Sequence, residues 1–450
     1  MQSWCPIISH LGRLRANHRK GFMSDNDKPL RLGVLGAGHV GGALLRALCN
    51  EPLAPRSPLA RMEVVKVLVR DLNKPRSFVL PPNQLTTSPE EIINHPDINV
   101  VVALMGGMNP EGGLIRRALR AGKHVVTANK ALLSLHGPDI ERLAIEHDRA
   151  LLYEAAVGGG MPVIRLMATH FQPSDVTRVE AILNGTCNFI LTELKNGTAF
   201  AAAVRRAQEL GLAEADPSMD LSGRDAAQKL ALLSTMIYGQ HCLEDHVCRV
   251  GIEQLDADDL AFAKSHGMAL VLLGTVFLDR SSVPHLSLLP TFVPGDAIHA
   301  RVEGPNNLLR VNTRLGGVFE GIALGAGGSP TALSVISDLN ALLTGAWRGE
   351  YRGALAYSTD YLGSDAPFLT ERHAFYLRFG SRDACNSLWE RCRAERMSVA
   401  RPAECILEVQ GTTLGWLRES LLGLPQPPAI VQYHPTLRPA SDLVNLSATQ

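Results

Sequence analysis

The sequence has no excess of either charge and no long apolar run. Its 450 residues include 44 lysines and arginines and 44 aspartates and glutamates, so the formal net charge at pH 7 is zero. Binding to a nucleic acid or to an acidic membrane surface needs clustered positive charge, so the composition supports neither partner. Because no apolar stretch is long enough to cross a bilayer, no membrane-spanning segment is expected.

Paired cysteine spacing is absent as well. The eight cysteines are scattered along the chain, which is typical of proteins in a reducing cytosol, so a cytoplasmic location is expected. One local group of cysteine and histidine stands out, and it comprises His241, Cys242, His246 and Cys248. Its spacing matches no standard zinc pattern, so no zinc site is predicted there.

The length of the chain predicts two or three domains with an ample core. Residues 1–29 differ from the rest, since they are basic and contain no acid before Asp25. This composition is compatible with a targeting peptide. However, Met23-Ser24-Asp25 resembles a natural start, which favours a loose, flexible extension over residues 1–29.

A glycine-rich turn at residues 36–41 is the most informative stretch that the sequence does contain. The apolar run Leu32–Leu35 precedes it, and a helical pattern of apolar residues follows it. A strand, G-x-G-x-x-G and a helix in this order are typical of dinucleotide-binding folds. Gly36 allows the tight turn, Gly38 lets the backbone approach a pyrophosphate, and Gly41 lets the helix pack against the strand. Free N–H groups at the helix start would bind the anion.

The nucleotide preference depends on the end of the second strand, expected at Val64–Val69. Arg70 follows this strand, and Lys74 and Arg76 add positive charge nearby. In a dinucleotide fold this position faces the adenosine ribose, where an arginine can pair with a 2′-phosphate. The pattern favours NADP over NAD. Asp71 could instead accept a hydrogen bond from the ribose 2′-hydroxyl, and the residues alone leave both readings open.

Two further strand ends are expected at the cofactor. The third strand is predicted at Asn99–Leu104 and is followed by Gly106-Gly107, and Lys130 lies just past the fourth strand, His124–Val126. Ligands of open parallel sheets lie outside the carboxyl ends of the strands. Lys130 is therefore expected to meet a phosphate, a nicotinamide or a carbonyl group. A fifth strand is predicted at Ala150–Tyr153.

The segment Glu154–Pro162, EAAVGGGMP, marks a change of domain. Its two alanines and three consecutive glycines leave backbone carbonyls accessible, and with the Glu154 carboxylate these carbonyls could bind a hard cation. A flexible hinge would have the same composition. The residues alone do not separate the two interpretations.

Acidic residues gather around the start of a helix predicted at Ser222–Ile237. Asp225 and Lys229 are four residues apart and share one helix face, and Glu214 and Asp220 precede them. A surface ion pair would also explain the spacing of Asp225 and Lys229. Because the group opens an otherwise apolar helix, it indicates a polar substrate pocket. Its carboxylates would bind an ammonium group, and Lys229 would donate a proton to a carbonyl undergoing reduction.

The last third of the chain contains a second glycine turn and a separate module. The turn at residues 325–331 precedes a helix predicted at Ala332–Leu343, whose start could also face the cofactor. Residues 351–371 are expected to form a linker. The elements predicted over residues 372–436 follow the order βαββαβ, which indicates a small ferredoxin-like module. Residues 437–450 are expected to form a loose tail.

Taken together, these features resemble the homoserine dehydrogenase family. The shared motifs, in the family's order, are GAGHVGG, ALMGG, AGKHVVTANKALL, YEAAVGGGMPVIR, ILNGTCNFIL, GLAEADPSMDLSGRDAAQKLALL and GAGGSPTA. They extend from Leu32 to about Leu343. The resemblance implies an α/β fold with a Rossmann-type NAD(P)-binding domain over residues 30–153. It further implies an α+β catalytic and dimerisation domain over residues 154–350 and an ACT-like domain over residues 372–436.

The resemblance also implies an activity and the residues for it. The implied enzyme reduces L-aspartate 4-semialdehyde to L-homoserine by reversible hydride transfer, in threonine, methionine and isoleucine biosynthesis. Lys229 would be the proton donor and acceptor, and Lys130 would be the second catalytic lysine. The implied substrate-binding residues are Glu214, Asp220, Asp225 and Lys229. The implied cofactor-binding residues are Ala37, Gly38, His39, Val40, Gly41, Arg70, Gly106, Lys130, Gly211 and Gly327. A cation site of sodium type maps to Glu154 and to the main-chain carbonyls of Val157, Gly159 and Met161.

The C-terminal module departs from the family pattern. Family ACT domains follow their first strand with a segment containing aspartate, proline and glycine, whereas this chain has Gly380–Cys385 there. We therefore expect a degenerate ACT-like domain without threonine binding. A homodimer or higher homo-oligomer is expected, because family members dimerise through the second domain. Two alternatives are a catalytically silent cofactor-binding paralogue and another amino-acid-derived NAD(P) dehydrogenase. The presence of both Lys130 and Lys229 argues against the silent paralogue.

Overall fold

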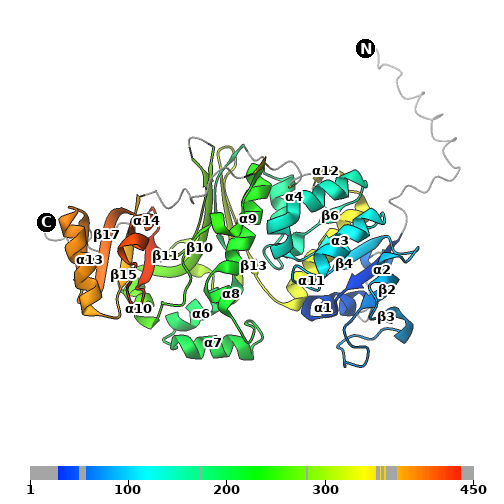
Figure 1. Ribbon diagram of the computed structural model, residues 1–450, viewed down its shortest axis with the longest axis horizontal. Helices are drawn as coiled ribbons and strands as arrows, with labels where there is room; N and C mark the ends of the chain where they lie inside the picture. Colours follow the sequence, from blue (N-terminus) through cyan, green and yellow to red (C-terminus); the bar gives the residue numbers. More distant parts are fainter. Residues whose placement is uncertain are drawn as a thin grey trace, which may run out of the picture.

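A computed structural model of the chain describes residues 29–49, 57–171, 174–279, 282–350, 355, 359–360 and 372–436. The expected N-terminal extension (apart from residue 29), most of the expected linker and the expected tail lie outside these residues. Figure 1 shows three parts in a row: a parallel sheet in blue and cyan, a mixed sheet mainly in green, and a small module in orange and red. No helix of the described segments has the length and apolarity that a bilayer crossing requires.

The first part is a parallel sheet of the dinucleotide-binding type. Its strands are β1 (Leu30–Leu35), β2 (Met62–Leu68), β3 (Leu85–Thr86), β4 (Val100–Ala103), β5 (His124–Thr127) and β6 (Leu151–Leu152). Their order in the described sheet is β3-β2-β1-β4-β5-β6. The order reverses between β1 and β4, which is where such sheets bind nucleotides. The helices of this part are α1 (His39–Cys49), α2 (Glu90–Ile93), α3 (Glu111–Arg120) and α4 (Lys130–Glu146). The expected Rossmann-type arrangement is confirmed, and the short strand β3 was not expected.

The second part is built on a mixed sheet. Its strands are β7 (Val176–Ile182), β10 (Met268–Leu278), β11 (Pro284–Pro294), β12 (Asn306–Thr313) and β13 (Gly317–Leu324), in the order β13-β12-β7-β10-β11. The sequence predicts strands at Thr177–Ile182, His285–Pro294 and Asn307–Thr313, which correspond to β7, β11 and β12, but it does not predict β10 or β13. The helices of this part are α5 (Val163–Thr169), α6 (Gly185–Lys195), α7 (Phe200–Glu209), α8 (Ser218–Leu221), α9 (Arg224–Tyr238) and α10 (Ala257–Ser265). Short strands are β8 (Gln240–His241), β9 (Cys248–Arg249) and β14 (Thr359–Asp360).

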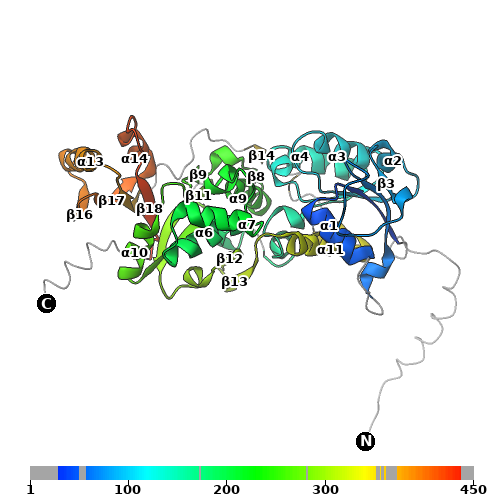
Figure 2. The ribbon, with the colours of Figure 1, turned by 90° about the horizontal axis from the view of Figure 1, so that it is seen from below.

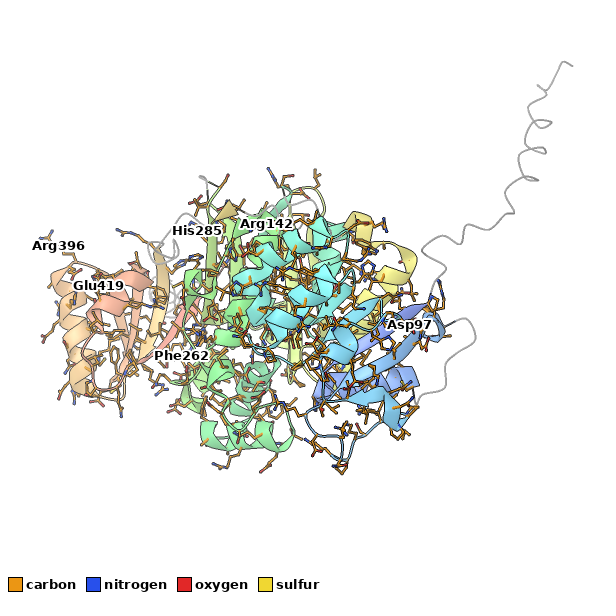
Figure 3. All side chains as sticks on the ribbon, turned by 45° about the vertical axis from the view of Figure 1, so that its right-hand side comes forward. Asp97, Arg142, Phe262, His285, Arg396 and Glu419 are labelled. Atoms are coloured by element: carbon orange, nitrogen blue, oxygen red, sulfur yellow. The ribbon has the colours of Figure 1, made fainter. Side chains whose placement is uncertain are left out.

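The C-terminal module has the βαββαβ order that the sequence predicted. Its elements are β15 (Arg372–Arg378), α13 (Arg382–Ala394), β16 (Ser398–Ala403), β17 (Ile406–Thr413), α14 (Leu414–Ser420) and β18 (Ala429–Tyr433). Its sheet continues the mixed sheet, because β18 pairs in parallel with β11. Phe262 of α10 lies at this junction in Figure 3, and its ring centroid is 4.7 Å from that of Tyr376. The module is therefore packed onto the second part and shares its sheet.

One helix crosses between the first two parts. Helix α11 (Gly328–Thr344) follows β13 of the mixed sheet but packs on α1 of the parallel sheet, and the two helices lie side by side in Figures 1 and 2. The start of α11 thereby reaches the glycine turn of the nucleotide-binding part. Helix α12 (Trp347–Glu350) follows it.

Candidate active site

A cavity of about 1070 Å³ opens beside the glycine turn. Ala37, Gly38 and His39 line it, and Val40 and Gly41 follow in the first turn of α1. Gly36 has φ +99°, and a Cβ on Gly41 would lie 2.2 Å from the Gly36 carbonyl oxygen. A Cβ on Gly38 would meet no atom within 4 Å, because this position opens into the cavity. The turn is thus closely packed at Gly41 and open to the cavity at Gly38. An open backbone at this position is what the approach of a pyrophosphate requires.

The start of α11 faces the same cavity. Gly328 and Ser329 belong to its lining, and Gly327, with φ +118°, directly precedes the helix. A Cβ on Gly328 would lie 2.7 Å from the carbonyl oxygen of His39. Two helix N-termini, from two parts of the molecule, therefore face one cavity, and the N–H groups of helix starts favour an anion. Gly211, in contrast, lies at the exposed end of α7 with φ +70°.

Basic side chains dominate one wall of the cavity. Arg46, Arg70, Lys74 and Arg76 all line it, whereas Asp71 is the single acid among the lining residues of this cavity. The Oδ1 atom of Asp71 accepts a hydrogen bond from the Asn73 N–H at 2.8 Å. Arg70 is exposed at the end of β2. The wall therefore carries an excess of positive charge where an adenosine ribose would lie.

The loop after β4 is held by a buried carboxylate. Oε2 of Glu111 accepts hydrogen bonds from the N–H groups of Met105 (2.6 Å) and Gly106 (2.8 Å). Its Oε1 atom accepts one from Nδ2 of Asn129 at 3.0 Å. Burial raises the pKa of Glu111, and these hydrogen bonds oppose that rise. Gly106 is thereby tied to the turn that carries Lys130.

The two predicted lysines meet at one carboxylate. Lys229, on α9, donates a hydrogen bond to Oδ2 of Asp225 at 2.6 Å, and Nζ of Lys130, at the start of α4, lies 3.0 Å from Oδ1. Lys229 also donates to the Leu183 carbonyl oxygen at 2.9 Å. Helix α4 belongs to the nucleotide-binding part and α9 to the mixed-sheet part. The two ammonium groups therefore converge from opposite sides of the boundary between the parts.

The shared carboxylate controls the electrostatics of this cluster. The charge of Asp225 raises the pKa of Lys130, against the opposite effect of burial. Burial raises the pKa of Asp225, but the ammonium groups of Lys229 and Lys130 outweigh burial and hold this pKa well below its usual value. The Asp225 carboxylate therefore lies between two basic side chains that favour its ionised form.

The predicted acids occupy two different environments. Asp220 lies beside Asp225, since Nδ2 of Asn184 donates to Oδ1 of Asp220 at 2.7 Å and to Oδ2 of Asp225 at 3.0 Å. Burial and the charge of Asp225 raise the pKa of Asp220. Glu214 lies on an exposed turn, and its charge contributes less than that of Asp225 to the raised pKa of Lys130.

The predicted cation ligands surround the start of α5. Glu154 is buried and its carboxylate accepts hydrogen bonds from the N–H groups of Ile164 (2.9 Å) and Arg165 (2.8 Å). Asp338 of α11 lies next to it, because its Oδ2 accepts from the Glu154 N–H at 2.9 Å. Oδ1 of Asp338 is buried without a hydrogen-bond partner. Val157 and Met161 are buried nearby, and the Gly159 carbonyl accepts a hydrogen bond from the Ser334 hydroxyl.

Sequence reasoning missed three residues of this arrangement. Asn184 and Asn129 act as N-caps, since their side chains accept from the N–H groups of Cys187 and Leu132. Asparagine before a helix is a capping signal, but no local pattern shows that the same side-chain amide also donates a hydrogen bond to a distant carboxylate. Glu111 is the first residue of a helix that the sequence predicts at Glu111–Ala121, and no pattern there marks its carboxylate as part of the site.

Comparisons with known proteins point to one family. A family model described as "Homoserine dehydrogenase, NAD binding domain" matches residues 36–154, and one described as "Homoserine dehydrogenase" matches residues 162–339. A homoserine dehydrogenase of Synechocystis sp. is 41% identical over 318 residues, which are 69% of this chain and 72% of that protein. One of Pseudomonas aeruginosa is 35% identical over 364 residues, or 79% of this chain and 83% of that protein. A crystal structure of a homoserine dehydrogenase from Thiobacillus denitrificans superposes with a TM-score of 0.77 at 30% identity, covering 90% of this chain and 98% of that one.

Proposed function

The chain belongs to the homoserine dehydrogenase family, oxidoreductases with a nicotinamide-dinucleotide-binding domain, and we propose that it interconverts L-aspartate 4-semialdehyde and L-homoserine in amino-acid biosynthesis. The observation that carries the proposal is the meeting of Lys130 and Lys229 at Asp225. Lys130 directly follows Asn129, which is linked through Glu111 to the N–H group of Met105. Met105 lines the nucleotide cavity. A carbonyl placed between the two lysines would face two positive charges at the position where an alkoxide develops.

The proposed reaction assigns one task to each group. When bound, the reduced nicotinamide supplies the hydride that the aldehyde carbon accepts. The aldehyde oxygen becomes an alkoxide, which Lys229 protonates through Nζ, and Lys130 lowers the cost of the negative charge. Asp225 holds Lys229 in place through the hydrogen bond at 2.6 Å. In the reverse direction Lys229 accepts the proton from the homoserine hydroxyl.

The ammonium group of the amino-acid substrate needs carboxylates as binding partners. Asp220 and Glu214 border the lysine pair, and their negative charges both act on Lys130. We assign them, with Asp225, to the substrate ammonium group. Gly211 lies three residues before Glu214, and its positive φ allows the exposed turn to change direction there.

The preferred nucleotide in this proposal is NADP. Arg70 and the neighbouring basic residues of the cavity wall provide partners for a 2′-phosphate, and Arg70 lies at the strand end that faces the ribose. The Oδ1 atom of Asp71 is already engaged by Asn73. Ala37–Gly41 and Gly327 would hold the pyrophosphate through backbone groups.

A monovalent cation, with sodium as the expected ion, belongs to the proposal. Glu154 would bind it with the carbonyls of Val157, Gly159 and Met161. The residues fit such an ion, because the buried Asp338 carboxyl group is close enough to Glu154 for the charge of Glu154 to raise its pKa, and Oδ1 of Asp338 has no hydrogen-bond partner. Replacing NaCl by tetramethylammonium chloride should lower the melting temperature of the protein. Equal melting temperatures in the two salts would remove the cation from the proposal.

We also propose a cytoplasmic homodimer. Strand β13 lies at the edge of the mixed sheet in the described part of the chain, and its side chains Val318, Ile322 and Leu324 are each about half exposed. Apolar edge strands of this kind are normally covered by another chain or element. Light scattering of the wild type and of Ile322→Lys tests this, with a dimer expected for the wild type and dissociation for the variant. A monomeric wild type would contradict the assignment.

The C-terminal module is proposed to be a degenerate ACT-like domain that does not bind threonine. Its segment Gly380–Cys385 runs from β15 into α13 without the family's aspartate, proline and glycine. Calorimetric titration of the full chain with L-threonine should show no saturable binding. Saturable binding that truncation before residue 372 abolishes would contradict this assignment.

The direct test of the activity is nucleotide reduction by the purified chain with L-homoserine. We expect oxidation of L-homoserine with NADP⁺ at a higher kcat/KM than with NAD⁺, and little turnover of L-serine or L-threonine. Nucleotide binding without any turnover would support the silent paralogue instead. Preference for another amino alcohol would support a different amino-acid-derived dehydrogenase.

A further inference from the structure

Glu111 is a fully buried carboxylate that the reaction described above does not use. It lies at the start of α3 with no exposed surface, yet it makes no ion pair with a lysine or arginine in the described part of the chain. Its hydrogen-bond donors are instead backbone N–H groups, the Asn129 side-chain amide and the Thr127 hydroxyl. A buried charge held in this way stabilises a specific arrangement of its donors, because each donor is left unpaired if the carboxylate is removed.

The donors of Glu111 come from two loops at the same edge of the parallel sheet. Oε2 binds the N–H groups of Met105 and Gly106, which follow β4, and Oε1 binds the side-chain amide of Asn129, which follows β5. Strands β4 and β5 are direct neighbours. Asn129 also donates to the Gly107 carbonyl at 2.6 Å. The two loops are thus joined twice, through Glu111 and through Asn129.

Each of these loops leads to a part of the site. Met105 lines the nucleotide cavity, and Lys130 directly follows Asn129, whose Oδ1 caps α4 by accepting from the Leu132 N–H at 3.0 Å. A shift of the carboxylate would therefore change the spacing between the cavity wall and the Lys130 ammonium group. A displacement of about 1 Å between reacting groups can lower the reaction rate roughly 100-fold.

We propose that Glu111 is a positioning residue that fixes Lys130 relative to the Met105–Gly107 loop and so to the nucleotide. This inference rests on the proposed function for its consequence in catalysis, but the network itself can be tested without turnover. Glutamine in place of Glu111 keeps the shape of the side chain. The amide nitrogen of glutamine donates hydrogen bonds and cannot accept them. Either the N–H groups of Met105 and Gly106 or the amide of Asn129 would therefore lose their acceptor.

The experiment compares Glu111→Gln with Glu141→Gln. Glu141 is a matched control, because it is also a buried glutamate of the same part, on α4, and accepts a hydrogen bond from the Leu355 N–H. We expect Glu111→Gln to lower kcat for homoserine oxidation by roughly 10- to 100-fold, with KM for homoserine little changed, and the control to retain wild-type kcat. A kcat of Glu111→Gln within twofold of the wild type, or equal losses in both variants, would overturn the proposal.

A second variant separates positioning from helix capping. Asn129→Ser retains an N-cap hydroxyl but is too short to reach both Glu111 and Gly107. If the two residues act as one unit, the double variant Glu111→Gln/Asn129→Ser should have a kcat no lower than the poorer single variant. Multiplicative losses would overturn the proposal.

Hydrogen exchange provides a readout that does not depend on the reaction. The Met105 and Gly106 amides should exchange faster in Glu111→Gln than in the wild type and in Glu141→Gln, and NADPH should bind more weakly to Glu111→Gln alone. Unchanged exchange and unchanged NADPH affinity would overturn the positioning role. Absence of homoserine oxidation by the wild type would count against the proposed function, and these two measurements would still decide on Glu111.

Discussion

At the scale of single residues, the site is organised by the Asp225 carboxylate. Its two oxygens contact Lys229 and Lys130, and Asn184 donates a further hydrogen bond to it. A carboxylate between the two lysines holds both side chains close together, although two ammonium groups would repel each other. Substrate binding would then place the reacting oxygen near groups that are already positioned.

Asp225→Asn should change the pH dependence of the reaction. Asp225 is the main cause of the raised pKa of Lys130, and without its charge the desolvation of Lys130 favours the neutral amine. The pKa of Lys130 should fall, so the alkaline limb of kcat/KM against pH should move to lower pH. The measurement is a pH profile of homoserine oxidation by both proteins. An alkaline limb that stays in place or moves upward would contradict this role of Asp225.

At the scale of elements, the glycine turn and the start of α1 form one closely packed wall of the nucleotide cavity. The packed side of the turn is set by Gly41, whose missing Cβ allows the Gly36 carbonyl to come close, and the open side is set by Gly38. The start of α11 closes the cavity from the mixed-sheet part. Nucleotide binding is therefore expected to depend on backbone shape more than on any one side chain.

Gly38→Ala and Gly41→Ala should separate binding from stability. The Cβ in Gly38→Ala meets nothing within 4 Å, so this variant should keep the wild-type melting temperature but lose NADPH affinity, since its methyl group enters the cavity. The Cβ in Gly41→Ala would lie 2.2 Å from a carbonyl oxygen, which should cost about 1–3 kcal/mol of unfolding free energy. Thermal melts and NADPH titrations measure both. Equal melting temperatures for the two variants would contradict the account.

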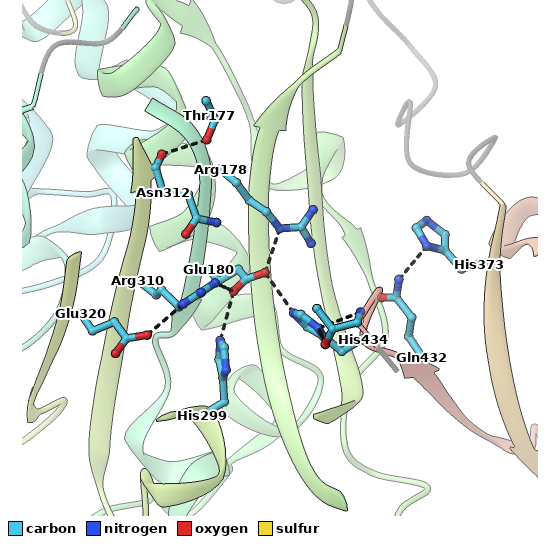
Figure 4. A network of polar contacts seen from close by, with 11 residues as sticks. Thr177, Arg178, Glu180, His299, Arg310, Asn312, Glu320, His373, Gln432 and His434 are labelled. Atoms are coloured by element: carbon cyan, nitrogen blue, oxygen red, sulfur yellow. Dashed lines mark hydrogen bonds and ion pairs between the residues drawn. The ribbon is translucent and has the colours of Figure 1, made fainter. Parts of the chain in front are cut away.

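At the scale of the whole molecule, a buried network ties the C-terminal module to the mixed sheet. Figure 4 shows Glu180 of β7 at its centre. Arg178 and Arg310 donate to the Glu180 carboxylate at 2.8 Å each, and Nε2 of His299 lies 3.2 Å from it. His434, which directly follows β18 of the module, contacts it at 3.1 Å. Strand β7 leads directly into Leu183 and Asn184, so the module is anchored to the strand that supports the lysine cluster.

Glu180→Gln should destabilise the protein in a pH-dependent way. Burial raises the pKa of Glu180, but hydrogen bonds from the two histidines and the charge of Arg178 lower it far more, so the net pKa lies well below the usual 4.5. A lowered pKa contributes stability above pH 4.5 that is lost as the pH falls further. At pH 7 the variant should lose about 3 kcal/mol of unfolding free energy, and the difference from the wild type should shrink below pH 4.5. Denaturant unfolding at pH 7 and pH 3.5 measures it, and an equal difference at both values would contradict this role.

The sequence predicted local features better than long-range ones. The strand, glycine turn and helix at residues 30–49 follow from local pattern, as does the Asp225–Lys229 pair at helical spacing. That Lys130 belongs to the same site as Lys229 came from the family resemblance alone. Its contact with Asp225 was not predicted, because no local pattern joins residues 95 positions apart in the chain. Strand β10 was missed because its continuous apolar run lacks the alternation of a half-buried strand. The pairing of β18 with β11 was missed because pairing partners leave no local signal.

We propose that Lys229 transfers the proton when the chain oxidises L-homoserine. The most direct measurement is NADPH formation from L-homoserine by Lys229→Ala, beside the wild type and the exposed-lysine control Lys195→Ala. We expect kcat to fall roughly 10²- to 10⁴-fold in Lys229→Ala, with NADPH affinity and melting temperature close to those of the wild type and full activity in the control. Near-normal turnover by Lys229→Ala would contradict it.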